Sequence, residues 1–229
     1  MTEVEHLTER YAQRTLGMHA SEIRSLFAVA SRPEIVSLAG GMPNLSALPM
    51  EMMGTLVEKL VKENGQEALQ YGSGQGHPKL REQILDVMAL EGIRANADDV
   101  VVTTGSQQAL DLISRIFIDP GDVVLAEAPS YVGALGTFQQ YQAQVVHIAL
   151  DDHGLIPEAL REAIRTVRFS GRKIKFLYLI PNYQNPSGVL LSADRRTEIL
   201  EICRSEKIFV VEDNPYGLLG FDRPSPNAM

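Results

Sequence analysis

The stretch "KFLYLIPNYQNPSG", residues 175–188, joins an apolar run to a turn crowded with amides and prolines. A continuous apolar run of this length is typical of a strand that is buried on both faces of a sheet. A segment with helical periodicity follows at residues 192–206, where Ser192 is placed to cap the helix. A plain turn needs only one or two residues of the turn type. The remaining amides raise the question of what they bind.

The same alternation of strand and helix extends on both sides of this stretch. Strands are expected at residues 98–104, 123–129, 143–150, 173–181 and 207–213, with helices at 106–117, 131–141, 156–168 and 192–206 between them. Apolar strands separated by amphipathic helices favour an α/β fold, in which helices cover both faces of a mostly parallel central sheet. We therefore expect a three-layer α/β domain.

The first part of the chain has a different pattern. Helices are expected at residues 20–31 and 50–63, and a glycine-rich turn at 71–76 leads into a third helix that ends near residue 92. This turn, "YGSGQG", does not predict a dinucleotide site, because a helix rather than a strand precedes it. We divide the chain into an N-terminal arm and small-domain segment, residues 1–49, and a large domain, residues 50–229.

Composition and charge exclude several classes of function. The 229 residues contain 21 basic and 29 acidic side chains, a formal charge of −8, and the basic ones are scattered, so we expect no nucleic-acid partner. No apolar run is long enough to cross a bilayer, and the charged start of the chain does not resemble a secretory signal, so we expect a cytoplasmic protein without a membrane partner. Cys203 fits the buried face of a helix, and the five scattered histidines predict no metal site.

Polar and aromatic residues gather where the expected strands end. Ligands of open parallel sheets bind beyond the carboxyl ends of the strands. Gly105, Ser106 and Gln107 open a helix there, and free N–H groups at such a turn suit a phosphate, although Ser106 alone also fits a simple helix cap. Tyr131 follows the next strand, and it offers either an aromatic face to a ligand or a core side chain.

Two further strand ends complete this set. Asn185 follows one strand and Asp213 ends another, and each alone also fits a plain turn or cap residue. Together the ends supply an anion site, an aromatic face, an amide and a carboxylate. A planar, phosphorylated ring that contains nitrogen, such as pyridoxal 5′-phosphate, would use all four groups.

The motifs and their spacing resemble those of a known family. The segments "GSQQALDL", "PSY", "NYQNPSG" and "EDNPYG" resemble the fold-type I, class I/II pyridoxal-phosphate aminotransferases, and the segment at residues 21–44 resembles their 2-aminoadipate and kynurenine subgroup. The resemblance implies that Ser106 and Gln107 bind the cofactor's phosphate and that Tyr131 stacks on its ring. It also implies that Tyr71 reaches the phosphate of a second subunit, in a homodimer with shared active sites.

The resemblance assigns the remaining site residues as well. Asn185 and the hydroxyl of Tyr216 would donate to the phenolic oxygen of the ring, and Asp213 would pair with the ring nitrogen. Arg24 and Gly40, together with Asn185, would meet the substrate.

The implied reaction moves an amino group from an α-amino acid to a 2-oxo acid, with 2-oxoglutarate the expected acceptor, by a ping-pong route. A β-lyase or a decarboxylase would use the same cofactor site, and a non-catalytic ligand sensor would use the same fold. The family also needs a lysine past the D-x-x-Y motif, and none of the six lysines of this sequence is in that context. We therefore expect the sequence to be the N-terminal part of the enzyme, with the lysine and the small domain beyond Met229, and residues 1–229 alone to be inactive.

Overall fold

The computed structural model describes residues 9–17, 32, 34–36, 45–220 and 226–229. The chain divides into two compact units, one made of Met1–Met18 with Gln75–Met229 and the other of His19–Gly74. The helix expected at residues 20–31 and the site residues Arg24 and Gly40 lie outside the described residues. The division that we predict after residue 49 stays a prediction.

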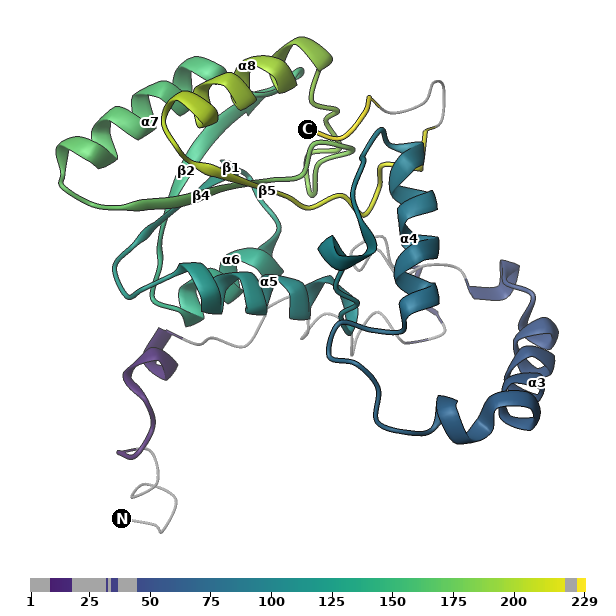
Figure 1. The fold of residues 1–229 in the computed structure, drawn as a ribbon. Helices are drawn as coiled ribbons and strands as arrows, with labels where there is room; N and C mark the ends of the chain where they lie inside the picture. The colour runs from purple at the N-terminus through teal and green to yellow at the C-terminus, as the bar shows by residue number, and fades with distance from the viewer. Residues whose placement is uncertain (1–8, 18–31, 33, 37–44, 221–225) are drawn as a thin grey trace. The chain divides into compact units, whose positions relative to one another are not determined.

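A five-stranded sheet forms the centre of the first unit (Figure 1). Its strands, in the spatial order β3-β2-β1-β4-β5, are β3 (Gly154–Leu155), β2 (Gln144–Asp151), β1 (Val123–Ala128), β4 (Ile174–Leu179) and β5 (Phe209–Glu212). The strand β1 pairs in parallel with β2 and β4, and β4 pairs in parallel with β5. Of the strands in the described residues, only the two-residue β3 runs antiparallel, to β2. The prediction of a mostly parallel sheet is therefore confirmed.

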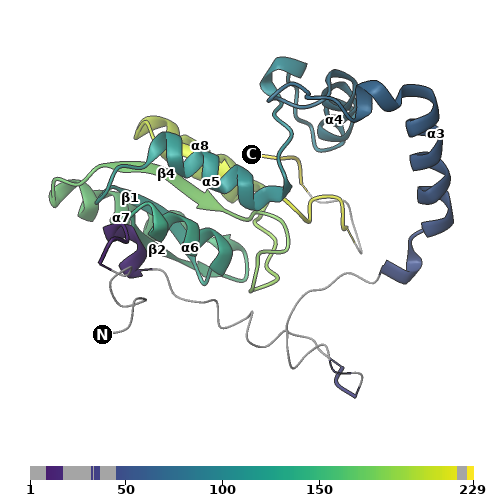
Figure 2. The same cartoon turned by 90° about the horizontal axis from the view of Figure 1, so that it is seen from below.

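Helices cover both faces of this sheet (Figures 1 and 2). On one face lie α5 (Gly105–Phe117) and α6 (Val132–Gln140), and on the other lie α7 (Pro157–Phe169) and α8 (Ala193–Ser205). Each helix returns the chain to the start of a strand that is parallel to the earlier ones, as a parallel sheet requires. The three-layer arrangement agrees with the α/β fold expected from the sequence.

The strand β1 is largely apolar because it contributes to two cores. Along β1, Val123 and Leu125 pack toward α7 and α8, while Val124 and Ala126 pack toward α5 and α6. Successive side chains of a strand point to opposite faces, so a strand covered on both sides has no solvent-facing position. This explains why hydrophobicity is continuous rather than alternating along β1.

Aromatic rings stabilise the core on the α5 and α6 side. The ring of Phe138 meets those of Phe176 and Tyr178 edge to face, with centroids 5.5 and 5.4 Å apart. Such edge-to-face pairs add to the free energy gained by burial. On the other side of the sheet, Cys203 is buried, and burial raises the pKa of its thiol to about 11, so it is an inert core residue as the sequence predicts.

The helix boundaries follow the sequence signals closely. Pro157 occupies the first turn of α7, where its missing N–H has no helical partner to lose, and Ser192 is the N-cap residue of α8. The helix α4 (Pro78–Leu90) likewise begins at a proline. Two short 3₁₀ segments, η1 (Gln13–Gly17) and η3 (Ala97–Asp99), complete the described elements of this unit.

The strand expected at residues 98–104 is not formed, and this prediction was wrong. Its start is the 3₁₀ turn η3, and its rest takes no part in the sheet. Val102 donates its N–H to the carbonyl of Gln75 at 2.8 Å, while the neighbouring Val101 is 52% exposed. A strand needs a continuous ladder with a neighbour, and apolar sequence alone does not supply one.

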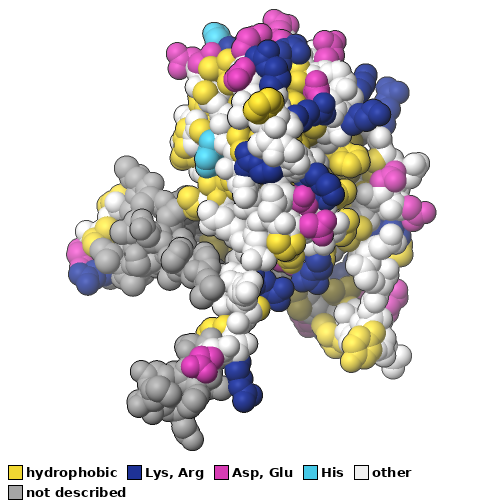
Figure 3. Space-filling view, turned by 90° about the vertical axis from the view of Figure 1, so that its left-hand side faces the viewer, with side chains coloured by type: hydrophobic (Ala, Val, Ile, Leu, Met, Phe, Trp, Pro, Cys, Tyr) yellow, Lys and Arg dark blue, Asp and Glu magenta, His cyan; other side chains and the backbone are white. Residues whose placement is uncertain are grey.

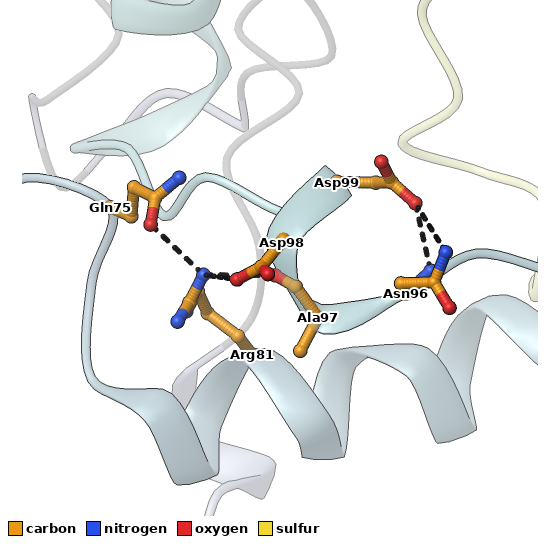
Figure 4. A network of polar contacts seen from close by, with 6 residues as sticks. All are labelled: Gln75, Arg81, Asn96, Ala97, Asp98 and Asp99. Atoms are coloured by element: carbon orange, nitrogen blue, oxygen red, sulfur yellow. Dashed lines mark hydrogen bonds and ion pairs between the residues drawn. The ribbon is translucent and has the colours of Figure 1, made fainter.

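Polar contacts hold this region in place (Figure 4). One guanidinium nitrogen of Arg81 donates to the side chain of Gln75 at 3.1 Å and to the carbonyl of Ala97 at 3.0 Å. Next to Gln75, a Cβ on Gly76 would lie 2.5 Å from the side chain of Val102, at a φ of +101°. The glycine-rich turn thus permits a close backbone approach, as we infer from the sequence.

The second unit contains η2 (Leu45–Ala47) and the helix α3 (Met50–Ala68), in which Asn64 departs from helical geometry. None of the helices in the described residues combines the length and the apolar character that crossing a bilayer requires. On the face shown in Figure 3, Lys and Arg side chains stand between Asp and Glu side chains, so the two signs of charge are mixed there.

Candidate functional site at the carboxyl edge of the sheet

Three connecting segments meet at the carboxyl ends of β1, β4 and β5. They are residues 129–131, residues 180–191 and residues 213–217. A hydrogen bond links the start of α5 to α6, the helix that follows the first of these segments. The segment of residues 180–191 is called the amide loop below, because it contains Asn182, Gln184 and Asn185. All of these residues belong to the first compact unit.

The start of α5 is linked to α6 by a short chain of hydrogen bonds. The side-chain amide of Gln107 donates to the hydroxyl of Thr137 at 2.5 Å, and this hydroxyl donates to the carbonyl of Gly133 at 2.9 Å. The ring of Tyr131 lies against Gly133, where a Cβ would come within 2.5 Å of the tyrosine hydroxyl. Gln107 and Tyr131 are therefore held near one another, and Ser106 lies exposed in the first turn of α5.

A carboxylate ends the adjacent strand β5. The hydroxyl of the buried Tyr178 donates to Oδ2 of Asp213 at 2.7 Å, and the Asp213 N–H donates to the carbonyl of Leu179 at 2.9 Å. Burial, and then the charge of Asp213, raise the pKa of Tyr178 above its ordinary value, so the hydroxyl stays protonated and remains a donor. No residue in the described part of the chain donates to Oδ1 of Asp213, which leaves that oxygen for a ligand.

Two aromatic residues at this edge of the sheet come from different segments. Tyr131, at the N-cap of α6, and Tyr216, after β5, both pack against the core cluster that contains Tyr178. Both are partly exposed, whereas Tyr178 is buried. Two accessible aromatic side chains therefore border the core cluster that contains Tyr178, and Tyr178 itself bonds the carboxylate of Asp213.

The amide loop is fixed by two buried side chains, Asn182 and Gln184. The side-chain amide of Gln184 donates to the carbonyl of Pro129 at 2.8 Å, and its oxygen accepts from the N–H of Ser187 at 2.9 Å. Asn182 contacts Arg196 on one side and Asn214 on the other. Asn185, by contrast, is only partly buried. The loop therefore uses two of its amides to hold its own shape and leaves the third accessible.

A carboxylate in β1 also contributes to this edge. Glu127 is almost completely buried, and its Oε2 accepts from the N–H of Ile180 at 2.9 Å, at the start of the amide loop. Burial raises the pKa of Glu127 to about 7, despite hydrogen bonds from Ile180 and from the side chain of Gln184 that lower it. Glu127 thus holds the amide loop to the end of β1.

Comparison with known proteins identifies the family. The family model for aminotransferase class I and II matches residues 38–229. The chain belongs to this family. It is 40% identical to aromatic-amino-acid aminotransferase 1 of Thermococcus litoralis over 92% of the chain, and 36% identical to 2-aminoadipate transaminase of Thermus thermophilus over 93% of the chain.

A solved structure agrees with this assignment. The structure of Pyrococcus horikoshii kynurenine aminotransferase, "in complex with PMP, KYN as substrates and KYA as products", superposes on 97% of the chain with a TM-score of 0.87 and 37% identity. The chain covers 55% of that structure, and 51% of each of the two relatives above. It thus spans about half the length of these aminotransferases.

Within this member of the aminotransferase family, contacts in the structure link four of the nine predicted site residues to one region. Tyr131 and Tyr216 pack against the core cluster that contains Tyr178, Asp213 accepts from the Tyr178 hydroxyl, and Gln107 bonds to Thr137 of α6. Ser106 and Asn185 lie in the adjoining turn and loop, and no contact of their side chains links them to this group in the described structure. Tyr71 belongs to the other unit, where its side chain is fully exposed.

The sequence reasoning missed the supporting role of four residues at the site. They are Glu127, Asn182, Gln184 and Arg196, all of them buried. Glu127 could be found from the sequence, because it is a lone carboxylate inside the apolar strand "VVLAEA". A carboxylate in a buried strand almost always has a partner, and this one therefore points to a specific contact. The other three could not be found in this way, since amides in a turn and an arginine on a helix are ordinary surface residues until burial is known.

The lysines of the first unit lie away from this edge, as the sequence context suggests. Lys173 and Lys175 are at the amino end of β4, Lys207 precedes β5, and Lys79 is in the first turn of α4. Lys175 is engaged with Asp122 at 2.9 Å. None of the described strands therefore places a lysine at the carboxyl edge of the sheet.

Proposed function

We propose that the full-length protein is a pyridoxal-phosphate-dependent aminotransferase, which moves an amino group from an α-amino acid to a 2-oxo acid. The observation that carries the proposal is that Asp213 accepts from the buried Tyr178, while Tyr131 and Tyr216 pack against the core cluster that contains Tyr178, in a chain that belongs to the aminotransferase family. Tyr131 comes from one connecting segment, Asp213 and Tyr216 come from another, and Tyr178 comes from β4.

The family match and the matched complex with PMP indicate pyridoxal phosphate as the cofactor. The donor set at the edge fits such a group. Oδ1 of Asp213 lies outside the hydrogen bond with Tyr178 and suits a cationic ring N–H, Tyr131 and Tyr216 offer aromatic surface, and the N-terminal turn of α5 suits a phosphate. When bound, the cofactor supplies the electron sink for the bond that is broken at the Cα of the amino acid.

The residues of the chain would prepare this chemistry in distinct ways. Asp213 would hold a proton on the ring nitrogen by charge attraction, and the neutral hydroxyl of Tyr178 would orient the carboxylate. Tyr131 would bind the face of the ring. Asn185 and Tyr216 would donate to its phenolic oxygen.

The remaining assignments concern the substrates and the partner subunit. Ser106 and Gln107 would bind the phosphate, and Tyr71 would do so from a second subunit of a homodimer. Aromatic amino acids, 2-aminoadipate and kynurenine are the donors that we propose, because the similar proteins are named for them. We further propose 2-oxoglutarate as the acceptor, a ping-pong order and a cytoplasmic location.

The test is a transfer assay on the protein produced from its full reading frame. With pyridoxal phosphate, 2-oxoglutarate and a ¹⁵N-labelled donor, labelled glutamate should form together with the oxo acid of the donor. Release of ammonia or carbon dioxide without labelled glutamate would instead identify a lyase or a decarboxylase. Ligand binding with no turnover of any donor would contradict the proposal and favour a sensor.

A further inference from the structure

A chain of four polar side chains, two of them buried, connects the amide loop to the segment after β5. Arg196 donates from Nη2 to Oδ1 of Asn182 at 2.6 Å, and Asn182 donates from Nδ2 to Oδ1 of Asn214 at 2.9 Å. Asn214 then donates from Nδ2 to Oε1 of Glu91 at 2.6 Å. This chain is called the amide relay below. Asn182 is fully buried and Arg196 nearly so.

The two ends of the amide relay fix the direction of every hydrogen bond in it. A guanidinium group has donors only, and an ionised carboxylate has acceptors only. Asn182 must therefore turn its oxygen toward Arg196 and its NH₂ toward Asn214, and Asn214 must turn its NH₂ toward Glu91. Neither amide has an alternative orientation that keeps all three bonds, so the relay defines a single geometry.

Arg196 also ties the amide loop to the body of the domain. Its Nη2 donates to the carbonyl of Pro181 at 3.1 Å, and its Nε donates to the carbonyl of Leu191 at 3.1 Å. These two carbonyls lie near the two ends of the loop, while Asn182 lies within it. The guanidinium group therefore sets the position of Asn182, rather than merely pairing with its side chain.

The amide relay joins the two segments that carry the proposed ring contacts. Asn182 is three residues before Asn185, and Asn214 lies between Asp213 and Tyr216. We propose that Asn182 is a positioning residue, which sets the distance between Asn185 in the amide loop and Asp213 with Tyr216 in the segment after β5. This inference rests on the proposed function, since it concerns binding of the same cofactor.

Reversing the direction of one bond gives a sharp test. In Asn182→Asp, Oδ1 of Asn214 would face a carboxylate while its NH₂ is held by Glu91, so acceptor meets acceptor and the two segments should separate. Glu91→Gln alone should be nearly neutral, because a glutamine can still present its oxygen to Asn214. In the double variant, Asn214 can turn over, donate to the carboxylate introduced at position 182 and accept from the amide introduced at position 91. The total charge of the double variant equals that of the wild type.

The measurement is the dissociation constant for pyridoxal phosphate of the full-length protein, followed by absorbance, with the melting temperature of the cofactor-free form as a second readout. We expect Asn182→Asp to weaken binding by about tenfold or more, and the double variant to lie within about threefold of wild type. Arg195→Ala is the matched control, because the neighbouring Arg195 on α8 pairs with Asp151 away from the relay. It should lower the melting temperature without changing the dissociation constant.

The outcomes separate this inference from the function on which it rests. Unchanged cofactor affinity in Asn182→Asp, with or without a lower melting temperature, would overturn the inference, and so would a double variant no better than the single one. If Asn182→Asp does not fold, Glu91→Ala cuts the relay at its less buried end and should still weaken binding. Failure of the wild type to bind pyridoxal phosphate would overturn both the inference and the proposed function.

Discussion

The two ends of the parallel sheet carry polar side chains that are used in different ways. At the amino end, Lys175 pairs with Asp122 at 2.9 Å, and Arg168 pairs with Glu206 at 2.6 Å, across neighbouring elements. These contacts join opposite charges directly, and most of their members reach solvent. At the carboxyl end, the polar side chains are buried amides and carboxylates that contact backbone groups and each other, such as Glu127, Asn182 and Gln184.

The difference shows that the carboxyl end of the sheet fixes the positions of its side chains more strictly than the amino end does. An exposed ion pair tolerates many arrangements and adds little to the free energy of unfolding. A buried amide network is satisfied in only one arrangement, and it costs stability when any member is lost. The carboxyl end is therefore built to hold Tyr131, Asn185 and Asp213 in fixed positions.

The largest effect should come from the carboxylate of that end. Asp213→Asn keeps an oxygen that can accept from Tyr178, so the fold should survive, but it removes the charge that would hold a proton on the cofactor ring. We expect kcat of the full-length protein to fall by about 10²–10³-fold, the loss typical for removal of one electrostatic contact in an active site. Steady-state kinetics with the best donor measures this change. A variant with normal kcat would show that the charge of Asp213 is not used.

A second effect should appear in the dependence of stability on pH. The pKa of Glu127 is raised to about 7 by burial, so the folded protein binds its proton more tightly than the unfolded chain does. The stabilisation is complete below the ordinary glutamate pKa, about 4.5, and is lost as the pH rises through 7. Relative to Glu127→Gln, the wild type should lose about 3 kcal/mol between pH 4.5 and pH 8.

Urea unfolding of both proteins at the two pH values measures the Glu127 effect. The glutamine variant keeps an oxygen for the N–H of Ile180 and has no charge to bury, so it should be the more stable protein at pH 8. A constant difference between the two proteins across this pH range would show that Glu127 keeps an ordinary pKa.

At the amino end, loss of an ion pair should cost stability but leave the site intact. Lys175→Met removes the cation beside the buried Asp122, which we expect to cost about 1–2 kcal/mol near neutral pH. Burial raises the pKa of Asp122, but hydrogen bonds from Lys175 and from the backbone of Asp119 outweigh it, and the pKa is lowered. The cost should therefore shrink as Asp122 is protonated in acid.

Urea midpoints at pH 7 and pH 3.5, together with the dissociation constant for pyridoxal phosphate, check the Lys175 prediction. The dissociation constant should not change, because β4 begins at the opposite end of the sheet from the site. Weakened cofactor binding would show that the amino end of the sheet affects the site at its carboxyl end, so the two ends would not be independent.

The smallest effect should come from a pair on the surface of α7. Arg165 and Glu162 are both largely exposed and one helical turn apart. Arg165→Ala should change the free energy of unfolding by less than about 0.5 kcal/mol, as is usual for exposed pairs of this kind. A loss above about 1 kcal/mol in the same urea assay would show that exposed pairs matter more here than in most proteins.

The sequence predicts the α/β alternation well, because long apolar strands and amphipathic helices have distinct periods. It fails at residues 98–104, where "VVVTT" looks like a strand but pairs with no strand among the residues that the structure describes. The rule that ligands of parallel sheets bind beyond the carboxyl ends of the strands identifies Tyr131 and Asp213, because both lie at the ends of predicted strands. It does not separate Asn185 from Asn182 and Gln184, because only burial shows which amides of one loop are already bonded.

The most direct test is a crystal structure of the full-length protein with pyridoxal phosphate. The account predicts that the ring nitrogen lies within hydrogen-bonding distance of Asp213, about 2.6–3.2 Å, with the ring against Tyr131 and the phosphate at the start of α5. The amide relay from Arg196 to Glu91 should be unchanged. A cofactor bound elsewhere, or an Asp213 that contacts only Tyr178, would contradict the account.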